Sequence, residues 1–131
     1  VVSPQHRVLV SSAIAARMFD SPDVLIPAVK LLPLKGVEVC ADVSAGIEYW
    51  HILFEKHEIV WSNGMPTESL LTRPRALRAI SSRGRAEIRL LFPEMCDPDF
   101  EPVAVRLIPG KGRYMKKLVE RHQANNKPLY C

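Results

Sequence analysis

The sequence has 131 residues, 47% of them hydrophobic, and a formal net charge of +4 at pH 7. This length predicts one domain with a real core, or one domain plus an extension, and no apolar run is long enough to span a membrane. The three cysteines, Cys40, Cys96 and Cys131, form no Cys-x-x-Cys pair, which argues against a disulfide framework and a zinc knuckle. We expect buried or incidental thiols.

The pattern up to residue 69 is typical of short strands separated by turns. Pro27 stops one β-prone run, and the residues between it and Pro33 are sufficient for one helical turn. Turn-forming residues recur about every eight to twelve positions, which favours an all-β, turn-rich unit. The apolar runs that carry this prediction are residues 7–10, 13–19, 24–26 and 37–41.

A hairpin over residues 47–61 is the expected centre of this unit. Two β-prone runs, 47–54 and 58–61, flank the polar step 55–57. Alternation along the first run places apolar side chains on both faces, so we expect the hairpin to be among the most buried elements, with Trp50 and Ile52 out of water. Asn63-Gly64 then predicts a turn, since both residues tolerate a positive φ.

After residue 70 the apolar spacing changes to three and four, which predicts helices over 75–80 and 85–92, with Ser82 as an N-cap. A last helix is expected to open after Pro109 and to run to about residue 123, with Tyr114, Leu118 and His122 on one stripe. This half also holds most of the arginines and lysines. Basic faces of this kind are usually solvated, although they can also bind nucleic acid or anionic lipid.

The histidines are the candidate chemical groups. His6 lies three residues after Ser3 and directly before a predicted buried strand, where a neutral imidazole could polarise a peptide bond. His51 is expected to face the core and hold a hydrogen bond, whereas His57 is expected to be exposed in the hairpin loop. No cysteine or carboxylate stands at a familiar ligand spacing from these histidines, so the sequence predicts no metal and no cofactor.

Several segments, in this order, resemble the C-terminal part of bacterial Hint domains, the hedgehog/intein autoprocessing fold. The resemblance covers most of residues 1–94, and we find no family that residues 100–131 resemble. The segments that carry it are residues 3–10, 24–28, 51–54, 57–60, 64, 67–69, 85–88 and 91–94.

The resemblance implies a mainly β, Hint-like fold, incomplete at its N-terminus, with C-terminal helices. It also implies cis self-cleavage, in which a Cys or Ser upstream of Val1 attacks the preceding carbonyl of its own upstream polypeptide and forms a thioester or ester. Ser3 and His6 match the family's Thr/Ser-x-x-His motif, and His57 matches the later histidine that assists cleavage; His51 is a possible accessory residue. His6 and His57 are therefore expected to approach one pocket.

The predicted domains are residues 1–69, the Hint-like part, and residues 70–131, a helical, basic extension. The resemblance also implies that residues 1–131 alone are inert, because the nucleophile would lie upstream. Two alternatives remain open: a non-catalytic β module for interaction or export, and a basic nucleic-acid-binding module. No membrane span is expected, and the sequence leaves the cellular compartment unknown.

Overall fold

The computed structural model describes residues 1–130, so the predicted thiol at Cys131 lies outside the described residues. The chain forms two compact units, each built from separate stretches of sequence. Unit 1 contains Val1–Trp50, Ile59–Glu68 and the chain from Arg106 onward. Unit 2 contains His51–Glu58 and Ser69–Val105.

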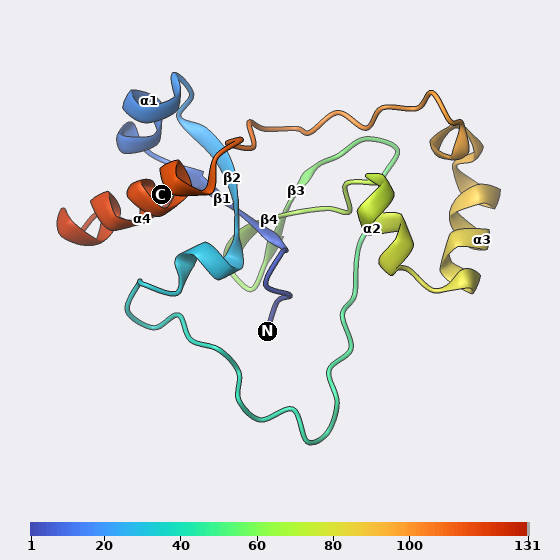
Figure 1. The fold of residues 1–131 in the computed structure, drawn as a ribbon, viewed down its shortest axis with the longest axis horizontal. Helices are drawn as coiled ribbons and strands as arrows, with labels where there is room; N and C mark the ends of the chain where they lie inside the picture. Colours follow the sequence, from blue (N-terminus) through green and yellow to red (C-terminus); the bar gives the residue numbers. More distant parts are fainter. Residues whose placement is uncertain (131) are drawn as a thin grey trace. The chain divides into compact units, whose positions relative to one another are not determined.

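Unit 1 contains a four-stranded antiparallel sheet with the strand order β2-β1-β4-β3 (Figure 1). In the first pair, Arg7 lies opposite Pro27 and Ser11 lies opposite Asp23. Alternate residues of β1, Val8 and Val10, are buried, as expected for a strand that packs one face on a core. The strands are β1 (Arg7–Ser11), β2 (Asp23–Pro27), β3 (Ile59–Ser62) and β4 (Met65–Glu68).

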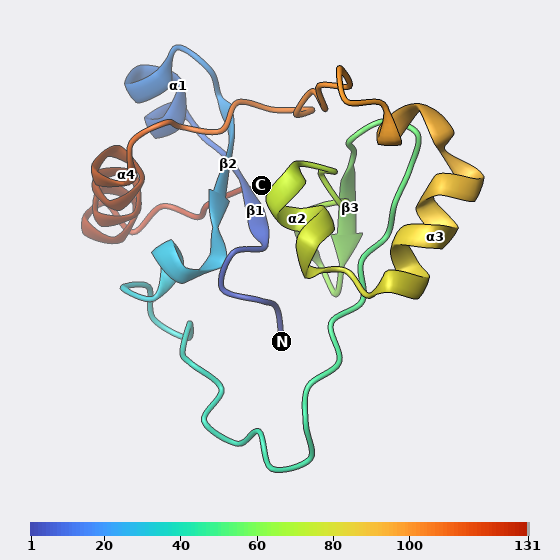
Figure 2. The same cartoon turned by 45° about the vertical axis from the view of Figure 1, so that its right-hand side comes forward.

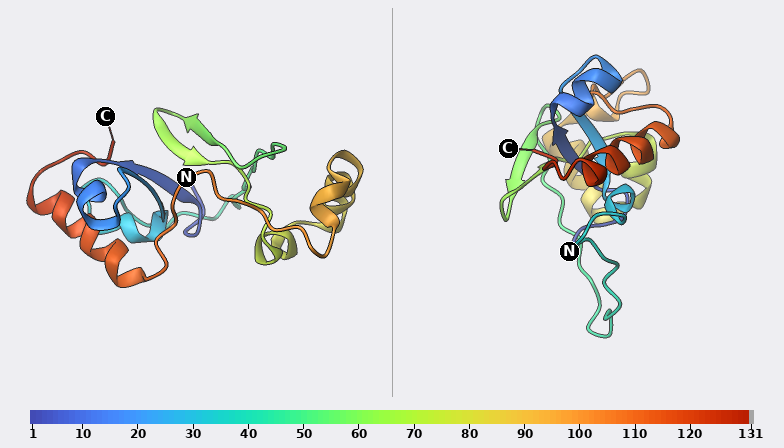
Figure 3. Two further views of the ribbon diagram at one scale, coloured as in Figure 1. Left: turned by 90° about the horizontal axis from the view of Figure 1, so that it is seen from above. Right: turned by 90° about the vertical axis from the view of Figure 1, so that its left-hand side faces the viewer.

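Helices supply the other half of the core of unit 1. The long helix α4 places Met115, Leu118, Val119 and His122 inside, at the three- and four-residue spacing of one helix face. This face packs with Val8 and other buried side chains of β1 and β2. Figures 1 and 3 show α4 in red beside the blue strands. The helical elements of unit 1 are α1 (Ala13–Phe19), the 3-10 turn η1 (Ala28–Leu31) and α4 (Gly112–Ala124).

The junction between β1 and β4 is narrow. Val8 and Thr67 are its one registered residue pair, and Pro66, the neighbour of Thr67, has no N–H for a ladder. The Glu68 side chain takes over part of the connection. Its Oε1 accepts from the Arg7 backbone N–H at 2.9 Å, and the Arg7 Nη1 lies 3.1 and 3.0 Å from the two carboxylate oxygens.

Unit 2 is mainly helical and has a small core. Ser81 caps α3 by accepting from the Gly84 N–H, so the N-cap lies one residue before the predicted Ser82. Ile88 is the buried residue of α3, and α2 has none. Figure 2 shows α3 leading directly into η2. The elements of unit 2 are α2 (Pro74–Ala79), α3 (Ser82–Leu91) and the 3-10 turn η2 (Pro93–Cys96).

Residues 13–19 form a helix, so the strand predicted there is wrong. The Ser12 hydroxyl accepts from the Ala15 N–H at 3.0 Å, which satisfies an amide that a helix start would otherwise leave unpaired. Asp20 ends the helix in the left-handed region at φ 55°. Single polar residues, Ser12 at the start and Asp20 at the end, therefore mark this apolar run as a helix.

The predicted buried hairpin over 47–61 is also wrong. The stretch 47–54 forms no regular strand, and Trp50 and Ile52 are 85% and 55% exposed. The observed hairpin instead pairs β3 with β4 across Asn63-Gly64, whose φ values of 49° and 76° confirm the predicted turn. Residues 37–41 likewise form no strand. Strand propensity becomes structure only where a neighbouring strand pairs with it.

The remaining expectations agree with the structure in part. The strand ending at Pro27, the helical turn after it and the three C-terminal helices are confirmed. The fold is less β-rich than predicted, because helices account for 34% of the residues and strands for 15%. Cys40 and Cys96 are exposed free thiols, so neither is buried. Within residues 1–130 no helix is both long enough and apolar enough to cross a bilayer.

We predict that Arg7→Ala lowers the free energy of unfolding by about 3 kcal/mol, because it leaves the buried Glu68 carboxylate without its guanidinium. The Glu68 side chain is 7% exposed. Urea unfolding followed by far-UV circular dichroism measures the change. Arg17→Ala, at an exposed position of α1, is the control and should change stability by less than about 0.5 kcal/mol. Equal effects of the two substitutions would contradict the assigned role of Arg7.

Candidate functional site

Ser3 and His6 lie at the two ends of one tight turn in unit 1. The His6 N–H donates to the Ser3 carbonyl at 3.0 Å, and the His6 carbonyl accepts from the Ala28 N–H at 2.8 Å. A further backbone bond joins Val29 to Pro4 at 3.0 Å. The main chain therefore fixes the half-buried His6 at the point where β1 begins. The Ser3-x-x-His6 motif thus forms one hydrogen-bonded turn.

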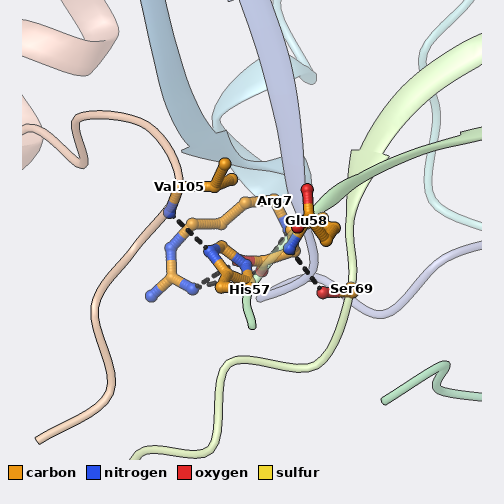
Figure 4. A network of polar contacts seen from close by, with 6 residues as sticks. Arg7, His57, Glu58, Ser69 and Val105 are labelled. Atoms are coloured by element: carbon orange, nitrogen blue, oxygen red, sulfur yellow. Dashed lines mark hydrogen bonds and ion pairs between the residues drawn. The ribbon is translucent and has the colours of Figure 1, made fainter. Parts of the chain in front are cut away.

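His57 lies in unit 2 and is held through its imidazole. Its Nδ1 accepts from the Val105 backbone N–H at 3.0 Å (Figure 4). The side chain is 7% exposed, so the predicted exposed position in a hairpin loop is wrong. The main chain at Val105, 48 positions later in the sequence, contacts the ring. The hydrogen-bonded, enclosed imidazole is a candidate chemical group.

The residue after His57 is fixed by a reciprocal pair of hydrogen bonds with Ser69. The Glu58 N–H donates to the Ser69 hydroxyl at 2.9 Å, and the Ser69 N–H donates to the Glu58 carbonyl at 2.8 Å. Figure 4 shows the first of these contacts. Ser69 is buried, so water competes little for the pair. The main chain beside His57 is therefore well defined.

A cavity of about 510 Å³ lies beside His57, within unit 2. This volume falls in the range of small-molecule or side-chain pockets. Four carboxylates and one lysine contribute to its wall, so its charged lining is net acidic. Its apolar lining includes Phe54, Leu70, Leu71, Met95, Phe100 and Val103, and its charged lining is Glu55, Lys56, Glu58, Glu94 and Glu101.

His51 does not pack into a core. It is exposed, in contrast to the expected core-facing position, since the strand that would have turned it inward does not form. Its accessory role stays a prediction. The expected convergence of His6 and His57 on one pocket also stays a prediction, because the two residues belong to different units.

A half-buried serine and a buried histidine form a pair in unit 1 that no sequence motif indicated. Ser12 Oγ lies 2.9 Å from His122 Nε2, and His122 Nδ1 lies 3.2 Å from the Lys127 carbonyl oxygen. A carbonyl can only accept, so Nδ1 carries the hydrogen and Nε2 accepts from the Ser12 hydroxyl. That hydroxyl also caps α1. The predicted stripe on the last helix pointed to His122, but nothing in the sequence pointed to its partner.

The described residues provide no metal site. Within residues 1–130, no three His, Cys, Asp or Glu side chains gather closely enough to hold an ion.

A family model described as Hint domain matches residues 1–74, more than half of the chain. The protein belongs to the Hint domain family. The match includes Ser3, His6, His51 and His57, and it includes all four strands. No curated protein and no solved structure matches the chain. The Hint match ends at the start of α2, so Val105 and α4 lie beyond it.

We predict that Ser12→Ala lowers the free energy of unfolding by about 2 kcal/mol, because it removes both the cap of α1 and the partner of a buried imidazole. Ser12→Thr keeps the hydroxyl and should recover more than half of the loss. Thermal unfolding of both variants measures this difference. Identical losses in the alanine and threonine variants would show that the hydroxyl contacts are unimportant. Because His122 is 1% exposed, His122→Ala should also destabilise unit 1.

Proposed function

We propose that this Hint domain protein is a self-processing module that cleaves a peptide bond of its own upstream polypeptide in cis. The nucleophile is a Cys or Ser upstream of Val1, and residues 1–131 without it are inert. The proposal assigns His6 and His57 as the catalytic histidines and Ser3 as the motif position that shapes the His6 turn. His51 is a possible accessory residue.

The observation that carries the proposal is the Hint domain match, which spans both histidine motifs. Two local features support it. The Ser3 to His6 turn is fixed by backbone hydrogen bonds, as a catalytic motif requires for orientation. The His57 ring is buried and hydrogen bonded, which limits its orientations.

The chemistry is an acyl shift followed by hydrolysis. The thiol or hydroxyl attacks the carbonyl carbon of the preceding residue, a C–S or C–O bond forms, and the C–N bond breaks. The departing amine takes up a proton, which an imidazole supplies, because an unprotonated amide nitrogen is a poor leaving group. Water then cleaves the thioester or ester, which yields a free carboxylate.

We further propose that residues 1–69 form the Hint-like part, which includes the sheet, and that residues 70–131 form a helical, basic extension. The helices α2, α3 and α4 all lie in the second part. The side chains of α4 pack with β1 and β2 in unit 1, so this boundary separates sequence regions and not folding units.

We predict that His6→Ala and His57→Ala each slow cleavage about 100-fold in the chain extended by its natural upstream sequence, because the first removes a proton-transfer group and the second removes a hydrogen-bond donor to the developing oxyanion. The measurement is the time course of cleavage products by mass spectrometry. The control is Gln5→Ala, at an exposed position next to His6.

Cleavage that continues unchanged in His6→Ala would overturn the catalytic assignment of His6. An extended chain that carries a Cys or Ser at the junction and stays intact would overturn self-processing as a whole. In that case the non-catalytic β module becomes the preferred function.

A second candidate function is nucleic-acid binding by α2 and α3. Five arginines of this region are exposed, and none of them forms an ion pair within residues 1–130. Guanidinium groups without carboxylate partners can bind phosphates with both N–H arms. These residues are Arg73, Arg75, Arg78, Arg83 and Arg89.

For this second candidate we predict that affinity for duplex DNA falls with salt, with a log–log slope of up to about −4.5 if all five arginines contact phosphates. Fluorescence anisotropy of a labelled duplex measures the slope. Replacement of Arg75 and Arg78 by Gln should reduce its magnitude by about 2, whereas replacement of the same residues by Lys should preserve it. A slope near zero would exclude phosphate recognition by this surface.

A further inference from the structure

The hydrogen bond at His57 determines where the imidazole carries its hydrogen. The Val105 backbone N–H can only donate, so the Nδ1 that it meets at 3.0 Å must present a lone pair. A neutral imidazole then carries its hydrogen on Nε2. The bond therefore fixes the tautomer of His57 and also the orientation of the ring.

The donor comes from a part of the chain outside the Hint match. Val105 is half-buried and lies 48 positions after His57, in an irregular stretch beyond η2. The stretch that carries it, residues 100–105, also lines the cavity beside His57. The same segment thus contributes both the wall next to the ring and the hydrogen bond to it.

We propose that residues 100–105 are a positioning element that holds His57 as the Nε2–H tautomer, with Nε2–H as a hydrogen-bond donor of the site. This inference rests on the proposed catalytic role of His57. The donor is a main-chain N–H, so the role does not depend on which side chain occupies position 105, provided that it is not proline.

Hydrogen-bond donation from Nε2 is the consequence for the chemistry. A neutral imidazole that accepts at Nδ1 can donate only through Nε2–H, and it can stabilise the negative charge that forms on the scissile carbonyl oxygen while it keeps its hydrogen. The proton for the leaving amine then comes from the other proposed catalytic histidine, His6. A ring that lost the Val105 bond would exchange between tautomers and orientations, and a smaller share of molecules would present the hydrogen correctly. Loss of such a supporting hydrogen bond reduces activity by roughly 10-fold to 100-fold in other sites.

The direct test is nuclear magnetic resonance of the ¹⁵N-labelled protein at about pH 8.5, well above the pKa of about 6.5 of a free imidazole. We expect a scalar coupling across the hydrogen bond between the Val105 amide nitrogen and His57 Nδ1. We also expect a directly bonded proton on Nε2. A proton bonded to Nδ1 of His57 would overturn the proposal.

A matched pair of chains isolates the N–H itself. Cys96 allows ligation of a recombinant segment, residues 1–95, to a synthetic segment, residues 96–131. One synthetic segment has the natural amide at position 105, and the other has an ester there, which replaces the N–H by oxygen and keeps the valine side chain. With ¹⁵N-histidine in the recombinant segment, the ester should shift the Nδ1 resonance of His57 and leave His51 unchanged. Unchanged His57 resonances would overturn the proposal.

Cleavage by the extended chain separates this inference from the function on which it rests. Val105→Pro, which removes the N–H, should slow cleavage at least about 10-fold, whereas Val105→Ala, which keeps it, should stay within about 2-fold of the natural chain. If the coupling is present but His57→Ala cleaves normally, the catalytic role of His57 fails while the tautomer assignment stands. If His57→Ala is slow but Val105→Pro is not, the positioning role fails while the catalytic role stands.

Discussion

The sheet of unit 1 depends on the interaction between Arg7 and Glu68. Pro66 deprives β4 of a ladder donor, and β1 and β4 share the single registered pair of Val8 and Thr67. The Glu68 carboxylate accepts from both the backbone and the guanidinium of Arg7, so it joins the two halves of the sheet where backbone pairing is weakest. This charged pair is specific in geometry, because Oε1 of Glu68 accepts from both the backbone N–H and Nη1 of Arg7, and Oε2 accepts from Nη1.

Local signals in the sequence predicted those parts of the fold that local chemistry determines. The turn at Asn63-Gly64, the stop at Pro27 and the spacing along α4 depend on φ preference or on helical periodicity, and each appears in the structure. The strand prediction for residues 47–54 was wrong because a β-prone run forms a strand only beside a partner strand, which a local pattern does not reveal. The strand prediction for residues 13–19 was wrong because the Ser12 hydroxyl caps a helix there, which the apolar run alone does not reveal.

The candidate site was predictable only in part, for a related physical reason. The positions of Ser3, His6 and His57 follow from motif order, whereas the environment of each depends on contacts between residues far apart in sequence. His51 is exposed and His57 is buried, which is the reverse of the positions that the predicted hairpin gave them. The Val105 N–H and the Ser12 hydroxyl are donors that no motif distinguishes, since every residue except proline has a backbone N–H and many serines cap helices.

The discontinuity of unit 1 has a consequence for synthesis on the ribosome. Its core combines side chains of β1 and β2, near the N-terminus, with Met115, Leu118 and Val119 of α4. The ribosome synthesises a chain from its N-terminus, so β1 and β2 are exposed to solvent before the residues of α4 that cover them have been translated. Unit 1 therefore completes its core only after α4 has left the exit tunnel, and until then its apolar strands are targets for chaperones.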